Sequence, residues 1–130
     1  MIARKSAWIG LMGLVLLAGC RTVLNHDKTF KLAVGDQEES TVDAIKKDQK
    51  IKVDVSATGG NVDVFVYLEK DAEAAKQAIA TKKALPALLE TALDKQAVVL
   101  EPTIPAGNAA VVVVRNNSTK PAEVRLKLTN

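Results

Sequence analysis

The most regular feature of the sequence is an alternation of apolar and polar residues with a period of two. Residues 50–57 set Ile51, Val53 and Val55 against lysine, aspartate and serine, and residues 122–129 repeat the pattern. Such alternation predicts a β-strand with one buried face and one wet face. The other predicted strands are residues 29–34, 41–46, 62–68, 97–100 and 109–115. About seven strands separated by turns predict a single antiparallel β-sandwich, a mainly β fold.

Two of these segments carry further information about the sheet. Residues 109–115 are almost wholly apolar, which predicts a central strand that is covered on both faces. The Thr-Gly-Gly-Asn sequence at residues 58–61 is a strong turn signal between two strand patterns. It predicts a hairpin that joins residues 50–57 to residues 62–68.

Two aromatic side chains fall on the outer face of the predicted strand 62–68. Its valines and its leucine point inward, so Phe65 and Tyr67 point outward. Exposed apolar side chains that lie together mark interaction surfaces, so both are candidate contacts for a partner. The alternative is that the helical segment that follows, or another strand, covers them.

The segment 71–94 interrupts the β pattern. Residues 71–83 are rich in Ala, Lys, Glu and Gln, with Ala75 and Ile79 on one helical face. Pro86 can occupy the first turn of a second short helix that runs to the end of the segment. This helical insertion is either the part that is specific to this protein's task or a structural cap over an open end of the sheet.

The beginning of the chain has the layout of a secretory signal. Arg4 and Lys5 precede an apolar run, residues 6–17, that is shorter than the roughly 20 residues of a membrane-spanning helix. The run ends in Leu17-Ala18-Gly19-Cys20, which resembles the lipobox of bacterial lipoproteins. The resemblance implies cleavage between Gly19 and Cys20 and fatty acyl chains, such as palmitate, on Cys20. The alternatives are an ordinary signal peptide with an incidental cysteine and an uncleaved anchor.

The lipobox sets the expected domain organisation and location. Residues 1–19 form the signal peptide, residues 20–28 the lipidated cysteine and a linker, and residues 29–130 the sandwich. Several acyl chains hold a protein on a membrane without spanning it. In lipoproteins of envelopes with two membranes, Asp after the cysteine commonly marks retention at the inner membrane. Arg21 stands there, which favours the outer membrane, facing the periplasm, over the inner membrane.

Charge and cysteine content narrow the classes of function. The chain has 18 basic and 15 acidic residues, and loss of Arg4 and Lys5 with the signal would leave a net charge of about +1. This balance lacks the basic footprint of a nucleic-acid-binding protein. Cys20 is the only cysteine, so the domain has no disulfide framework and relies on apolar burial.

The sequence offers little catalytic chemistry. His26 is the only histidine and lies in the predicted linker, so neither a metal site nor a cofactor site is expected. Asp54 and Asp63 could face each other across the predicted hairpin, but a glycosidase holds its two carboxylates in a cleft. We therefore assign no catalytic residue and expect the protein not to be an enzyme.

The second half of the chain resembles a known module. The stretch 59–67 (GGNVDVFVY), the turn 104–108 (IPAGN), and the strands 111–116 and 124–128 are similar to pre-peptidase C-terminal domains and related jelly-roll sandwiches of secreted bacterial proteins. The resemblance implies a non-catalytic accessory or binding module. We expect it to bind an envelope protein or a cell-wall component, or to act in assembly. The alternative is a small envelope enzyme, or an inhibitor of an envelope or secreted enzyme, since inhibition needs only one exposed loop.

Overall fold

The computed structural model describes residues 23–81 and 88–130. Within these ranges the chain forms mainly β-strands, with one short 3-10 turn and one α-helix. The elements are β1 (Asn25–Leu32), β2 (Gln37–Val42), β3 (Gln49–Lys50), β4 (Lys52–Thr58), β5 (Val62–Leu68), η1 (Glu69–Asp71), α2 (Ala72–Thr81), β6 (Leu88–Lys95), β7 (Ala97–Leu100), β8 (Thr103–Ile104), β9 (Ala110–Arg115) and β10 (Ala122–Thr129).

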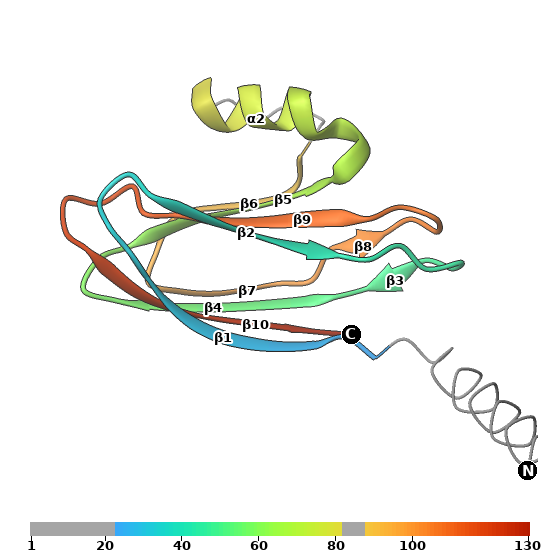
Figure 1. Cartoon of the computed structure of the whole chain (residues 1–130), viewed down its shortest axis with the longest axis horizontal. Coiled ribbons are helices and arrows are strands. Elements are labelled where there is room, and N and C mark those ends of the chain that lie inside the picture. Colours follow the sequence, from blue (N-terminus) through green and yellow to red (C-terminus); the bar gives the residue numbers. More distant parts are fainter. Residues whose placement is uncertain (1–22, 82–87) are drawn as a thin grey trace, which may run out of the picture.

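Two four-stranded antiparallel sheets face each other and form the predicted β-sandwich (Figure 1). The lower sheet in Figure 1 has the strand order β1-β10-β4-β7, and the upper sheet has the order β2-β9-β5-β6. Strands β3 and β8 form a small third sheet at one end. The helix α2 lies on the outer face of the upper sheet, which gives the fold a third layer.

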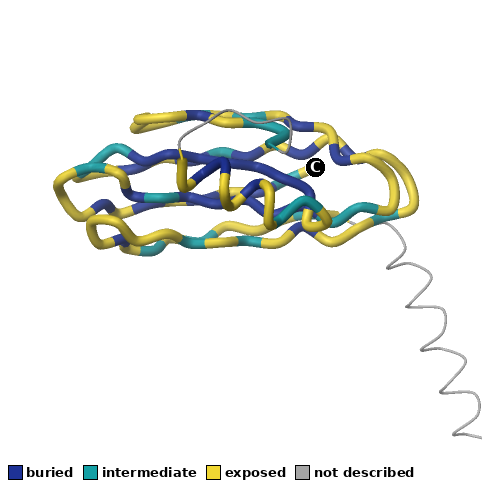
Figure 2. The backbone as a smooth tube through the Cα atoms, turned by 90° about the horizontal axis from the view of Figure 1, so that it is seen from above, coloured by how far each residue is buried: buried dark blue, intermediate teal, exposed yellow. Residues whose placement is uncertain are grey.

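The core between the sheets is aliphatic and is built largely from valine. Alternate residues of β4 and β10 point inward, as the sequence pattern predicts, while their charged neighbours face solvent. Strand β5 is buried along its whole length, and β9 is buried as far as Val114, so both are central strands covered on both faces. Figure 2 shows these buried segments in dark blue, with exposed loops at the two ends.

The predicted hairpin between residues 50–57 and 62–68 is wrong. Strand β4 pairs with β10 and β7, whereas β5 pairs with β9 and β6 in the other sheet. The turn that joins them therefore crosses from one sheet to the other. Its glycines are needed because a Cβ on Gly59, whose φ is +90°, would lie 2.7 Å from the Pro121 carbonyl oxygen, and a Cβ on Gly60 would overlap the Ser118 hydroxyl.

The predicted helical insertion, residues 71–94, is partly wrong. Its first half is the helix α2, with Ala75 and Ile79 buried as expected. Its last part is not a second helix, because residues 88–95 form strand β6 at the edge of the upper sheet. Leucine and alanine favour a helix in isolation, but backbone pairing with β5 overrides this weak preference. The predicted helix start at Pro86 lies outside the described residues.

Strands β1 and β2 begin earlier than the sequence pattern predicts. The predicted linker, residues 20–28, is wrong in its last part, since Asn25 already pairs with Thr129 of β10. The polar residues at the start of β1 lack the alternation that marks a strand, yet Asp27 is held by Arg125 through two hydrogen bonds of 3.1 and 2.9 Å. These contacts with a neighbouring strand were not visible in the local sequence.

Candidate functional site

The outer face of the upper sheet carries a second apolar cluster, separate from the core between the sheets. Phe65 and Tyr67 of β5 and Val111 and Val113 of β9 project from this face, where helix α2 packs against them. Phe65 is only 5% exposed and Tyr67 only 1% exposed. The prediction that they form an exposed contact surface is therefore wrong, and the alternative that the following helical segment covers them is confirmed.

The helix covers these side chains because its own apolar face matches theirs. Ala75 and Ile79 are one turn apart on α2 and are both buried against the aromatic pair. Removing a side chain such as Phe65 from water contributes about 1.5–3 kcal/mol to stability. The small Ala75 lets the helix backbone approach the sheet closely, while the larger Ile79 fills the space toward the helix end.

The hydroxyl of Tyr67 is the polar end of this apolar layer. It donates a long hydrogen bond of 3.4 Å to Oε1 of Glu39 on strand β2, which lies beyond β9 in the same sheet. Burial raises the pKa of Tyr67 above its usual value of 10.0, and the negative charge of Glu39 raises this pKa further. A buried tyrosine usually finds such a partner, so Glu39 orients the ring and keeps its proton in place.

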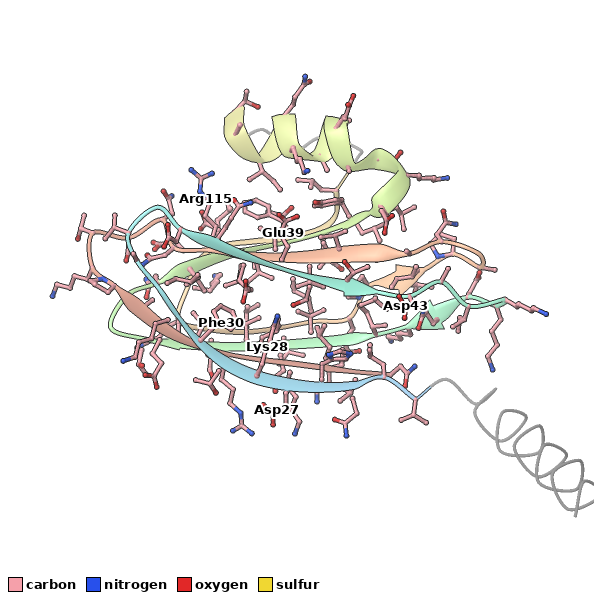
Figure 3. The ribbon with its side chains drawn as sticks, viewed as in Figure 1. Asp27, Lys28, Phe30, Glu39, Asp43 and Arg115 are labelled. Carbon is pink, nitrogen blue, oxygen red and sulfur yellow. The ribbon has the colours of Figure 1, made fainter. Side chains whose placement is uncertain are left out.

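A hollow of about 370 Å3 opens between α2 and the β2 side of the sheet. Tyr67, Ile79 and Val113 form its apolar part, and Lys76 and Arg115 bring two positive charges to it. The rest of its lining is Gly35, Gln37 and Ala80. No carboxylate lines this hollow among the residues that the structure describes. Figure 3 shows Arg115 projecting from the upper sheet toward the space below α2.

A second hollow of about 290 Å3 lies on the β6 side of the same helix. It shares Ile79 and Arg115 with the first hollow. Its apolar lining includes Phe65, Leu88 and Leu93, and Leu93 is 50% exposed at the surface. We call the two adjoining hollows the α2 groove. This groove spans the outer face of the sheet beneath α2.

A β-bulge shapes the polar end of the second hollow. The register between β5 and β6 shifts between Val62 and Val64, and Asp94 has a left-handed backbone, with φ of 57°. The buried Asp63 holds this conformation, because its carboxylate Oδ1 accepts the backbone N–H of Asp94 at 2.7 Å. Asn61 donates its side-chain N–H to the carboxylate of Asp94 at 3.1 Å. The Asp63 carboxylate is thus held by a backbone N–H and the Asp94 carboxylate by a side-chain amide.

Arg115 is the distinctive group of the α2 groove. It ends the buried strand β9 and is itself half-buried. Within residues 23–81 and 88–130, its guanidinium makes no hydrogen bond and no ion pair, and the same is true of the ammonium group of Lys76. The first hollow of the groove thus presents two cations beside apolar side chains, and neither cation has an ion-pair partner in the described part of the chain.

The catalytic candidates of the sequence do not come together in the structure. Asp54 lies in the lower sheet and Asp63 in the upper sheet, so the two carboxylates do not face each other. His26 lies in β1, opposite Leu128, rather than in a linker. In the described part of the chain, no group of three or more His, Cys, Asp or Glu residues could hold a metal ion.

The predicted processing site lies outside the described residues. Gly19 and Cys20, and the rest of the lipobox, precede residue 23, where the description begins. Among the helices that the structure describes, none has the length and apolar character required to cross a membrane. Cleavage after Gly19 and lipidation of Cys20 thus stay predictions from the sequence.

The fold and the groove define a class of protein, a two-sheet β-sandwich with a helix that caps one outer face. No family model matches the chain, and no curated protein matches it. Solved structures do match. The pre-peptidase C-terminal domain of a collagenase from Bacillus anthracis has a TM-score of 0.52 and 13% identity, over 79% of this chain and 89% of that one.

A second solved structure has the same fold. It is PliG from Aeromonas hydrophila, a periplasmic inhibitor of g-type lysozyme, with a TM-score of 0.51 and 13% identity. The match covers 84% of this chain and 88% of the inhibitor. At this level of identity both likenesses show the fold alone, and they support the sequence resemblance to pre-peptidase C-terminal sandwiches at that level.

The raised pKa of Tyr67 predicts a change of stability at alkaline pH. An unfolded tyrosine loses its proton near pH 10, whereas the folded protein retains that proton to higher pH. The unfolded state is therefore favoured as pH rises through and above about 10, and the free energy of unfolding falls. We expect Tyr67→Phe to make this fall shallower.

Urea denaturation at a series of pH values from about 9 to 11 measures this difference. The variant keeps every lysine of the parent protein, so lysine titration contributes equally to the two curves. If both proteins lost stability with the same dependence on pH, the account of Tyr67 would be wrong.

Proposed function

We propose that this protein is a lipid-anchored component of the cell envelope whose non-catalytic β-sandwich binds another envelope protein through the α2 groove. The observation that carries the proposal is Arg115, a half-buried residue that forms no ion pair among the described residues, in a groove with apolar walls and an exposed Leu93. A guanidinium without an ion-pair partner in its own chain keeps its hydrogen-bond donors available. A carboxylate of a partner protein could accept them.

The short distance between the predicted anchor and the sandwich supports this role. Strand β1 begins at Asn25, so at most five residue steps, or about 18 Å of extended chain, separate it from Cys20. The sandwich would then stay close to the membrane that holds the acyl chains. Arg21 favours the outer membrane, facing the periplasm, in an envelope with two membranes. A binding module held there meets partners that are confined to the same narrow space.

Site-specific cross-linking in the native envelope tests the binding role of the groove. Ala80 lines the groove and is exposed, while Ala74 is exposed on the same helix and does not line it. A photoreactive phenylalanine at position 80 is expected to capture one discrete protein, and the same group at position 74 is expected to capture none. Equal products from the two positions, or none from either, would argue against the groove as a docking site.

The anchor has its own test. Replacing Cys20 by Ser should abolish incorporation of labelled palmitate and leave the signal uncleaved, because the thiol is the atom that receives the lipid. Mass spectrometry of the purified protein measures both effects. A variant whose mature chain still begins at residue 20 and still carries acyl mass would contradict the lipobox prediction.

A second candidate function is inhibition of an envelope or secreted enzyme, favoured by a rigid pair of loops at the end of the sandwich that carries β3 and β8. The Gly107 N–H donates to the Ile45 carbonyl at 2.7 Å, and the Ala106 N–H donates to the Asp48 carboxylate at 2.8 Å. These bonds hold the β2–β3 loop against the β8–β9 loop. The first of these loops also carries Lys46 and Lys47, both exposed.

PliG, which has the same fold, inhibits g-type lysozyme, and this suggests g-type lysozyme as the first enzyme to test. Glycosidases use two carboxylates in a cleft, which the adjacent ammonium groups of Lys46 and Lys47 would fit. We expect the purified protein to slow cell-wall lysis by a g-type lysozyme, and Lys46→Glu with Lys47→Glu to weaken the effect about tenfold or more. Lys120→Glu, at another loop, is the matched control. No inhibition by the unaltered protein would exclude this candidate.

A further inference from the structure

We infer that the α2 groove recognises an acidic side chain of its protein partner, with the carboxylate between Arg115 and Lys76 and an adjoining apolar side chain in the second hollow. This inference rests on the proposed binding function and specifies the chemistry of the partner. It follows from which groups of the groove are already engaged and which are free.

The acidic residue opposite Arg115 on the sheet forms no ion pair with it. In the β5–β9 register, Asp63 is directly opposite Arg115. Its carboxylate instead accepts the Asp94 N–H and supports the β-bulge, and no ion pair joins it to the guanidinium. Gln37, opposite Arg115 on the other side, is neutral. Arg115 therefore keeps its planar set of donors available for a carboxylate, which it can bind through two parallel hydrogen bonds.

The opposite wall of the first hollow adds a second positive charge. Lys76 projects from α2 into the same lining as Arg115, and this lining contains no Asp or Glu. Glu39, on strand β2 of the same sheet, accepts the hydrogen bond of the Tyr67 hydroxyl and is not part of this lining. Two cations facing one small space over an apolar floor favour a ligand group with a negative charge.

The second hollow distinguishes a protein partner from an anionic sugar. It adjoins the first at Ile79 and Arg115, and Phe65, Leu88 and Leu93 give it an apolar lining. A protein segment can offer an acidic and an aliphatic side chain side by side, whereas a uronic acid chain surrounds its carboxylates with hydroxyl groups. The first hollow, of about 370 Å3, lies just above the lower end of the range for small-molecule pockets, about 300 Å3, and the second, of about 290 Å3, lies just below it, so each can take a single side chain.

Peptide binding to the full-length, detergent-solubilised protein tests the inference. The probe is the capped peptide acetyl-Gly-Leu-Glu-Gly-amide, and its comparison is the same peptide with Gln in place of Glu. We expect the Glu peptide to bind about tenfold more tightly, because a charge-assisted hydrogen bond is about twice as strong as a neutral one. Arg115→Glu should remove this preference, and Lys76→Glu should reduce it.

The controls separate charge from folding. Lys70→Glu makes the same charge change in η1, next to α2 but outside the groove, and should leave the preference intact. Arg115→Gln removes the positive charge without adding a negative one, so it replaces Arg115→Glu if that variant unfolds at a lower temperature. Either Arg115 variant with parental thermal unfolding and an undiminished preference for Glu would overturn the inference.

The remaining outcomes are also decisive. Equal binding of the Glu and Gln peptides, or no binding of either, would refute recognition of a carboxylate. Binding of a trigalacturonic acid probe in place of the peptide would assign the groove to an anionic polymer and overturn a protein ligand. If the cross-link from position 80 survives in Arg115→Glu, the groove still docks a partner, and only the role of the carboxylate fails.

Discussion

The whole structure depends on the burial of two adjacent strands, β5 and β9, on both of their faces. Their side chains are almost all apolar, so neither face can be left in water without a large loss of hydrophobic stabilisation. The lower sheet covers the inner face with its own aliphatic layer. The outer face requires a separate cover, and α2 supplies it.

Helix α2 has only ten residues and leaves part of the outer face of the upper sheet uncovered. The candidate site lies where this cover is incomplete. Helix α2 places Ala75 and Ile79 over the aromatic pair of β5, and hollows remain on either side of it. The run of valines in strand β9 ends at Arg115, which lines both hollows. The site is thus the margin of a hydrophobic layer, where a charge still has access to water and to a ligand.

The sequence predicted the faces of the strands well and their partners poorly. Alternation of apolar and polar residues reports which side chains are buried, so residues 122–129 were placed correctly as a strand. It does not report which strand lies alongside, so the turn at residues 58–61 was interpreted as a hairpin although it crosses between the sheets. Strand β6 was missed because its pairing with β5 outweighs the helical preference of its residues.

The strand pattern also predicted the face of the sheet that carries the candidate site, but not the charged residue that distinguishes this site. Phe65 and Tyr67 were singled out as outward-facing aromatics, and they do lie on that outer face, as the floor of the groove. Arg115 was overlooked as the ordinary charged end of an apolar strand. Its distinction is that it forms no ion pair among the described residues although Asp63 lies opposite it, because the Asp63 carboxylate accepts the Asp94 N–H.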